Sequence, residues 1–81
     1  MYRIRSENLD ELKEGKTVTY LSQITGFPRT YLNRVFTGTM LIEEERIPKL
    51  LIPIFKESLK LNEKYEKYGI DTMIQHFFKI I

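Results

Sequence analysis

Residues 16–38 most constrain what this chain can fold into, because they carry the end signals of two short helices and of a turn between them. Thr17 is a good N-cap residue, and Gly26 stops the helix that begins there. Pro28 follows in the turn, and it suits the first position of a helix because its missing N–H would have no partner there. Since Gly38 ends the second helix, the segment predicts two short helices joined by a tight turn.

The same segment contains no carboxylate, although acids are plentiful elsewhere in a chain of 81 residues with a net charge of +2. Its only charged residues are Lys16, Arg29 and Arg34. A carboxylate would repel phosphate, whereas positive groups gain affinity for a nucleic acid by releasing its counterions. A purely positive segment in a nearly neutral chain therefore favours a surface that meets a polyanion.

Cap residues predict one more helix before this segment. Asn8 is a good N-cap residue, and Glu11 three positions later completes a capping-box pattern. Gly15 is typical of the position after a helix end, so we expect a helix over 8–14. Residues 1–5 alternate apolar and basic side chains, which fits either a short strand or a loose arm.

The rest of the chain is expected to be helical as well. Three glutamates at 43–45 favour the positive end of a helix dipole and predict a short helix over 43–47. A longer helix is expected over 48–67, with a kink or a break at Pro53, because a proline inside a helix removes a donor and crowds the preceding turn. Apolar residues at helical spacing predict a last helix over 71–81.

These elements predict an all-α fold of about five helices in a single domain over 1–81. We expect a core over 9–51 and a C-terminal helical extension over 53–81. The chain has no cysteine, which excludes disulfides and thiolate metal sites. No apolar run approaches the roughly 20 residues of a membrane span. The first residues turn acidic too soon for a secretory signal, so the sequence predicts a soluble, cytoplasmic protein.

An enzyme is not expected. With no cysteine and a single histidine, His76, the common pairs of nucleophile and base are missing. The chain has neither a GxxxxGK[ST] loop nor a GxGxxG motif, and we expect no cofactor. His76 follows Gln75 and precedes Phe77, with no second plausible ligand nearby, so no metal site is expected either.

Residues 21–38, LSQITGFPRTYLNRVFTG, resemble the helix-turn-helix of the Cro/CI-type (XRE-like) phage repressor family. That family has a leucine, a small residue after it, a first glycine followed by an apolar residue, and a second glycine at the end of the next helix. The matching residues here are Leu21, Ser22, Gly26, Phe27 and Gly38, with Leu32 and Val35 as the apolar residues inside that helix. The resemblance covers 9–51 and implies a lambda-repressor-like domain, whereas 53–81 match nothing in the family.

The resemblance also implies a site and a function. The helix after Pro28 would lie in the major groove of an operator, where its side chains contact base edges. The base-contacting positions fall on Arg29, Thr30, Asn33 and Arg34. The phosphate contacts fall on Thr17 and Thr37, with Lys16 and Thr39 in reach. The implied function is that of a sequence-specific transcriptional repressor that binds double-stranded DNA as a dimer.

The apolar stripe of the last predicted helix has two interpretations. It either closes the core of the domain or forms the interface of the homodimer that a two-fold operator requires. The stripe consists of Met73, Ile74, Phe77, Phe78 and Ile81. Both interpretations hold together if Phe77 points inward and Phe78 points outward.

Other features fit a second class of function, a phage or mobile-element module that binds a protein, such as an antirepressor or an inhibitor of a host defence protein. Val18 stands where the family often has a phosphate-contacting glutamine, and the glutamates at 43–45 follow the positive segment closely. In this second interpretation the glutamates contact a basic protein partner, in addition to starting a helix. Arg3 and Arg5 are likewise either an arm for the minor groove or incidental charges on a strand.

Overall fold

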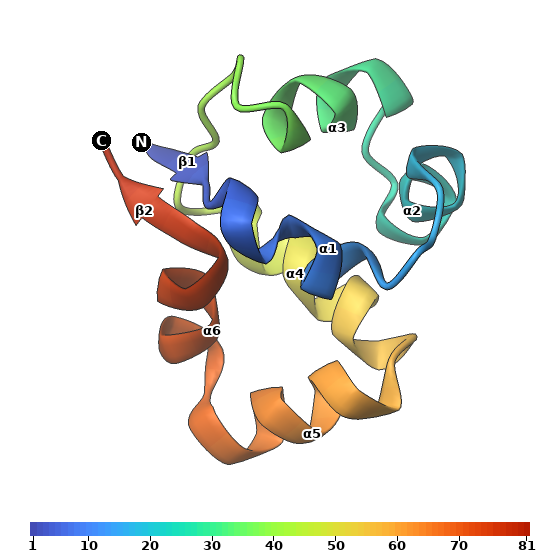
Figure 1. Cartoon of the computed structure of the whole chain (residues 1–81), viewed down its shortest axis with the longest axis vertical. Helices are drawn as coiled ribbons and strands as arrows, with labels where there is room; N and C mark the ends of the chain where they lie inside the picture. The colour runs from blue at the N-terminus through green and yellow to red at the C-terminus, as the bar shows by residue number, and fades with distance from the viewer.

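Six helices and a two-stranded antiparallel sheet make up the structure, a computed structural model that describes residues 1–81, the whole chain (Figure 1). The elements are β1 (Tyr2–Ile4), a 3-10 turn (Ser6–Asn8), α1 (Leu9–Lys13), α2 (Val18–Thr25), α3 (Arg29–Phe36), α4 (Arg46–Lys56), α5 (Leu59–Tyr68), α6 (Ile70–Phe77) and β2 (Phe78–Ile80). The predicted helical class is therefore confirmed. None of these helices combines the length and the apolar composition that crossing a membrane requires.

The central element is α4, which packs against α2, α5 and α6. One side of α4 is fully buried, and its buried side chains are Ile47, Leu50, Leu51, Ile54 and Phe55. Each large apolar side chain removed from water contributes about 1.5–3 kcal/mol to folding. This face of α4 therefore holds the N-terminal helices and the C-terminal helices in one core.

The predicted helix over 43–47 is wrong, and the break that was one of two alternatives at Pro53 does not occur. Residues 43–47 do not form a separate helix, because Glu44 and Glu45 lie in a turn and α4 begins at Arg46. Pro53 lies inside α4 without ending it. An interior proline costs roughly 3 kcal/mol, but the burial of five large side chains on the same helix outweighs that cost. Tertiary packing thus carries the helix past its proline as far as Lys56.

The break between α4 and α5 lies at Ser58 rather than at Pro53. The Ser58 hydroxyl oxygen accepts a hydrogen bond from the Leu61 amide at 3.1 Å, which caps α5. The same hydroxyl donates to Glu14 Oε2 at 2.8 Å, and this bond holds the pKa of the Glu14 carboxyl below its ordinary value. Glu14 ends α1 in a left-handed conformation with φ of 50°. The buried Ser58 thus ties the end of α1 to the start of α5.

Replacing Ser58 with alanine is expected to lower the free energy of unfolding by about 1–3 kcal/mol. The change removes the cap of α5 and leaves the Glu14 carboxylate without its shortest hydrogen bond. Urea denaturation measures the loss, with Ser6→Ala as the control because Ser6 is exposed and its side chain makes no cap. Equal stability of the two variants would contradict this role.

The termini form the sheet, which corrects the prediction of an all-α fold and of a last helix reaching Ile81. β2 pairs with β1 in the register Tyr2↔Ile80, Arg3↔Lys79 and Ile4↔Phe78. On its other side, β1 makes a single antiparallel bridge from Tyr2 to Ile42. The helix α6 ends at Phe77 because the next residue turns to an extended conformation and its side chain enters the core.

The apolar stripe near the C-terminus belongs mostly to this core. Met73, Ile74, Phe77 and Phe78 are all buried within the single chain, so they cannot also cover a partner subunit. The predicted dimer interface is therefore wrong at these four positions, and Phe78 points inward rather than outward. Of the predicted interface only Ile81 remains exposed.

The predicted capping box at α1 is not formed, because both of its side chains bond elsewhere. Asn8 makes no cap and instead donates from Nδ2 to the His76 carbonyl at 2.6 Å. Glu11 lies 2.8 Å from His76 Nε2 and 2.9 Å from Lys64 Nζ. Partial burial raises the pKa of Glu11, but the bonds from His76 and Lys64 outweigh it and leave the pKa lowered. These contacts fasten α1 to α5 and α6.

Candidate nucleic-acid interface

The outer face of α3 carries the four side chains that were predicted to contact bases. Three residues of this helix are buried, at the i, i+3 and i+4 spacing of one helix face, and they fix which face points inward: Leu32, Val35 and Phe36. The residues Arg29, Thr30, Asn33 and Arg34 are all exposed. Because residues four apart lie side by side on a helix, these four form two adjacent rows on one surface.

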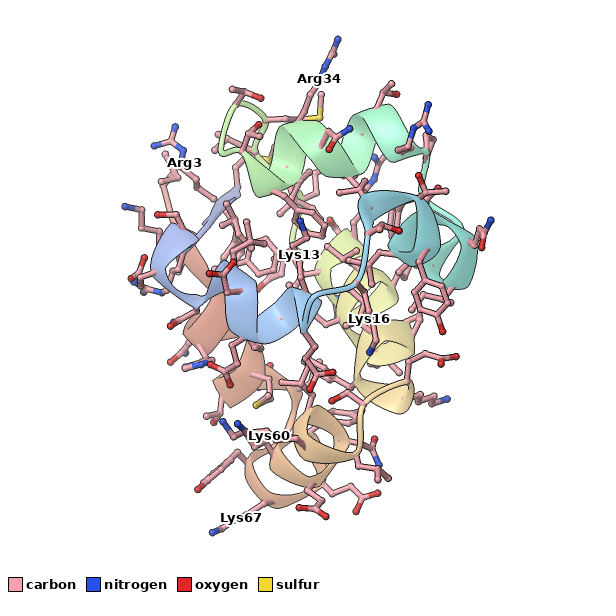
Figure 2. The ribbon with its side chains drawn as sticks, turned by 45° about the vertical axis from the view of Figure 1, so that its right-hand side comes forward. Arg3, Lys13, Lys16, Arg34, Lys60 and Lys67 are labelled. Carbon is pink, nitrogen blue, oxygen red and sulfur yellow. The ribbon has the colours of Figure 1, made fainter.

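No carboxylate pairs with either arginine of this face. The ion pairs of the molecule lie elsewhere, at Lys16–Glu14, Lys64–Glu11 and His76–Glu11. Arg29 makes only a long contact, 3.5 Å from Nη1 to the Thr19 hydroxyl on α2. In Figure 2 the Arg34 side chain extends away from the body of the molecule. Both guanidinium groups are thus free to bind an anion.

Residues in and around the turn between α2 and α3 make contacts that hold α3 in place. Gly26 adopts a left-handed conformation with φ of 81°, which a residue with a side chain rarely takes. The Ser22 hydroxyl donates to the Phe27 carbonyl at 2.6 Å. The Phe27 and Tyr31 rings stack at 5.5 Å, and the Arg46 guanidinium lies 5.6 Å from the centre of the Tyr31 ring. These contacts orient the outer face of α3.

Four residues were predicted to contact phosphate, and the structure leaves a free donor group on only some of them. Thr17 caps α2, as predicted, by accepting a hydrogen bond from the Tyr20 amide at 3.1 Å, and its hydroxyl hydrogen stays free. Lys16 is not beside α3, because its ammonium bonds to Glu14 and, at 3.3 Å, to the Glu57 carbonyl near the start of α5. Thr17 therefore keeps a free donor, whereas the Lys16 ammonium is bonded within the fold.

Thr37 and Thr39 lie at the end of α3, but their hydroxyl groups are already used there. Thr37 Oγ1 donates to the Asn33 carbonyl at 2.8 Å, and Thr39 Oγ1 donates to the Arg34 carbonyl at 3.2 Å. Both threonines thus close the last turn of α3. Their side chains stabilise the helix end, and they are not free donors for phosphate as the sequence had suggested.

Two further cations were not considered from the sequence: Arg46 lies over the Tyr31 ring of α3, and Lys79 lies opposite Arg3 on the sheet. Arg46 was missed because only the fold brings the start of α4 to Tyr31. Lys79 was missed because residues 78–80 were expected to be helical. The alternation of Phe78, Lys79 and Ile80 is the period-two pattern of a strand, and it was the signal that could have revealed Lys79.

The two N-terminal arginines have different surroundings. Arg5 is not part of a free arm, because its Nε donates to the carbonyls of Gln75 at 2.9 Å and Phe78 at 3.2 Å. Arg3 is exposed on β1, and its Cδ lies 3.9 Å from where a Cβ on Gly38 would stand. Arg3 therefore lies beside the loop that ends α3, while Arg5 holds the two ends of the chain together.

Comparisons of this chain with protein-family models, with curated proteins and with solved structures found no match. Fold and site together define a small, mostly helical domain with a two-stranded sheet, whose third helix presents an exposed positive face.

Proposed function

We propose that this protein is a sequence-specific DNA-binding transcriptional regulator, a Cro-like repressor in which α2 and α3 form a helix-turn-helix. The observation that carries the proposal is the outer face of α3, where Arg29, Thr30, Asn33 and Arg34 are exposed and no carboxylate pairs with the arginines. An α-helix fits the major groove of B-DNA, and side chains on one helix face then reach successive base pairs.

Each of these side chains has a matching chemistry in the major groove. Arg29 and Arg34 would each donate two hydrogen bonds to O6 and N7 of a guanine. Asn33 would pair with N6 and N7 of an adenine, and Thr30 would contact a base edge or a thymine methyl group. The free hydroxyl hydrogen of Thr17, at the N-terminus of α2, suits a phosphate oxygen.

The homodimer that we propose uses the open edge of β2 rather than the buried stripe of α6. The bonds from Arg5 N to Phe77 O at 2.7 Å and from Ile81 N to Met1 O at 3.1 Å show which residues of the strands face one another. By the alternation of an antiparallel ladder, the N–H and C=O groups of Ile80 face away from β1. The Ile80 side chain is 74% exposed, and the Met1 and Ile81 side chains are exposed beside it.

A second copy related by a two-fold axis at Ile80 would pair with this edge and cover these apolar side chains. In Figure 1, α3 lies at the same end of the molecule as the two chain termini, so such a dimer would present two copies of α3 on one side. Occupying an operator that overlaps a promoter would then block polymerase sterically.

The experiment that tests this function is selection from a pool of random DNA duplexes, followed by affinity measurement at two salt concentrations. We expect an enriched, nearly palindromic motif with half-sites about one helical turn apart. A steep salt dependence without enrichment would mean binding to the backbone alone. Absence of binding at low salt would overturn the proposal.

A second function is favoured by the surface at the start of α4. Glu43 and Glu45 are exposed there and form no ion pair, while Glu44 accepts a hydrogen bond from the Tyr2 hydroxyl at 3.0 Å. Tyr31 and, to a smaller extent, Glu43 and Glu45 raise the pKa of the nearby Arg46, but the two glutamates form no direct ion pair with it. Exposed acids of this kind suit a basic protein partner, as in an antirepressor or an inhibitor of a host defence protein. Binding to that partner would depend on Glu43 and Glu45 and would tolerate the loss of Arg29.

A further inference from the structure

The sheet holds two cations directly opposite one another. Arg3 on β1 and Lys79 on β2 are partners in the register, and both side chains are exposed. They are a hydrogen-bonded pair, because the bonds at Arg5–Phe77 and Met1–Ile81 lie two residues away on either side. Like charges placed directly opposite each other on a sheet destabilise it. The fold therefore keeps a charge repulsion that would disappear if either of the two residues were uncharged.

No acid of the chain relieves this repulsion. Neither Arg3 nor Lys79 takes part in an ion pair or in a side-chain hydrogen bond. The acid bound to β1 is Glu44, which contacts Tyr2. Because neighbouring residues of a strand point to opposite faces, Glu44 lies across the sheet from the Arg3 and Lys79 side chains. A bound partner with negative charge could therefore relieve this repulsion.

The pair lies next to the end of α3. The aliphatic part of Arg3 covers Gly38, in the loop that follows α3, and β1 is in contact with that helix. Figure 2 shows Arg3 and Arg34 extending outward at the same end of the molecule, while Lys60 and Lys67 lie at the opposite end. Arg3, with Lys79 opposite it on the sheet, thus lies at the same end of the molecule as Arg34 (Figure 2).

We propose that Arg3 and Lys79 form a clamp for the phosphate backbone of DNA, beside the groove that α3 occupies. The inference rests on the proposed function, since it assumes that a duplex lies against α3. A phosphate between the two side chains would neutralise both charges and release counterions, so the repulsion in the free protein becomes affinity in the complex. The clamp contacts no base, and it adds affinity without adding sequence preference.

Charge reversal at Lys79 separates folding from binding. Lys79→Glu places an acid opposite Arg3, and we expect the melting temperature of the free protein to rise by about 1–5 °C. The same variant should bind a fluorescein-labelled duplex of the selected sequence at least about tenfold more weakly, with a salt slope lower by about 1–2. Lys67→Glu, with the same change of charge at the far end of the molecule, is the matched control.

Three outcomes decide the inference. Higher stability, weaker binding and an unchanged preferred sequence for Lys79→Glu, with a much smaller effect of Lys67→Glu, would support the clamp. Equal losses for the two variants would overturn the clamp and leave the proposed function standing, because only the net charge would then matter. If the unaltered protein binds no duplex while remaining folded, the proposed function fails, and the clamp fails with it.

Discussion

Replacing both Arg29 and Arg34 with alanine is expected to weaken binding to the preferred duplex by about 2–6 kcal/mol, since each arginine that contacts a guanine contributes about 1–3 kcal/mol. In affinity this is a loss of about 30-fold to about 10⁴-fold. Both side chains are exposed and have no acidic partner, so the stability of the free protein should change by less than about 0.5 kcal/mol. Fluorescence anisotropy and urea denaturation measure the two quantities.

The control for this double variant is Lys60→Ala combined with Lys67→Ala. It removes the same two positive charges from α5, at the end of the molecule opposite α3 (Figure 2). We expect this control to lose affinity only through the weaker long-range field, and to keep the preferred sequence. Equal losses of affinity in the two double variants would show that α3 does not lie in the groove.

Replacing Phe55 with alanine is expected to lower the free energy of unfolding by about 3–5 kcal/mol. Phe55 on α4 is fully buried, and its ring lies 5.4 Å from the Tyr65 ring on α5 and 6.2 Å from the Phe77 ring on α6. A chain of 81 residues has a total stability of about 4–12 kcal/mol. The variant should therefore lose between about a quarter and all of the stability of the chain.

Urea denaturation with Leu59→Ala as the control tests this expectation. Leu59 is the first residue of α5, and its side chain is 87% exposed, so its loss should change stability by less than about 0.5 kcal/mol. If Phe55→Ala costs less than about 1 kcal/mol, then α5 and α6 do not share a core with α4. In that case the C-terminal part of the chain would be an appendage to the N-terminal helices.

The two predictions with the largest effects concern different parts of the molecule, the buried core and the exposed surface of α3. Phe55 belongs to the buried face of α4, the helix that packs against α2, α5 and α6, whereas Arg29 and Arg34 are exposed on α3 and have no acidic partner in the free protein. A core variant such as Phe55→Ala is expected to lose binding only in proportion to the fraction of the protein that is unfolded. A variant of the exposed surface of α3 is expected to lose binding while remaining folded. Measuring stability beside affinity thus separates the scaffold from the surface.

Local signals in the sequence predicted α2, the turn and α3 well. Thr17 caps α2 through the Tyr20 amide, and Gly26 has the positive φ that the turn needs. Leu32 and Val35 are buried, as their spacing indicated. Such signals succeed because a cap, a turn residue and an apolar row each act over at most one or two helical turns. The exposed positions of α3 follow once its buried positions are known.

Non-local contacts caused the errors. Pro53 was expected to kink or break its helix, but the packing of the core around α4 decides where that helix ends. Lys16 and Thr37 look available in the sequence, and both are bonded within the fold. The stripe of α6 looked wide enough for an interface, yet its side chains and Phe78 are buried in the core of the single chain.

The sequence by itself determined the helix ends between 16 and 38, the absence of acids there, and so the positive outer face of α3. Only the tertiary structure decided that residues near the two termini pair, which sets Arg3 opposite Lys79 and buries Phe78. The reason is physical. A helix end depends on a few neighbouring residues, whereas the pairing of β1 with β2 joins segments separated by nearly the whole chain. Such pairing forms only because the core between the segments brings them together.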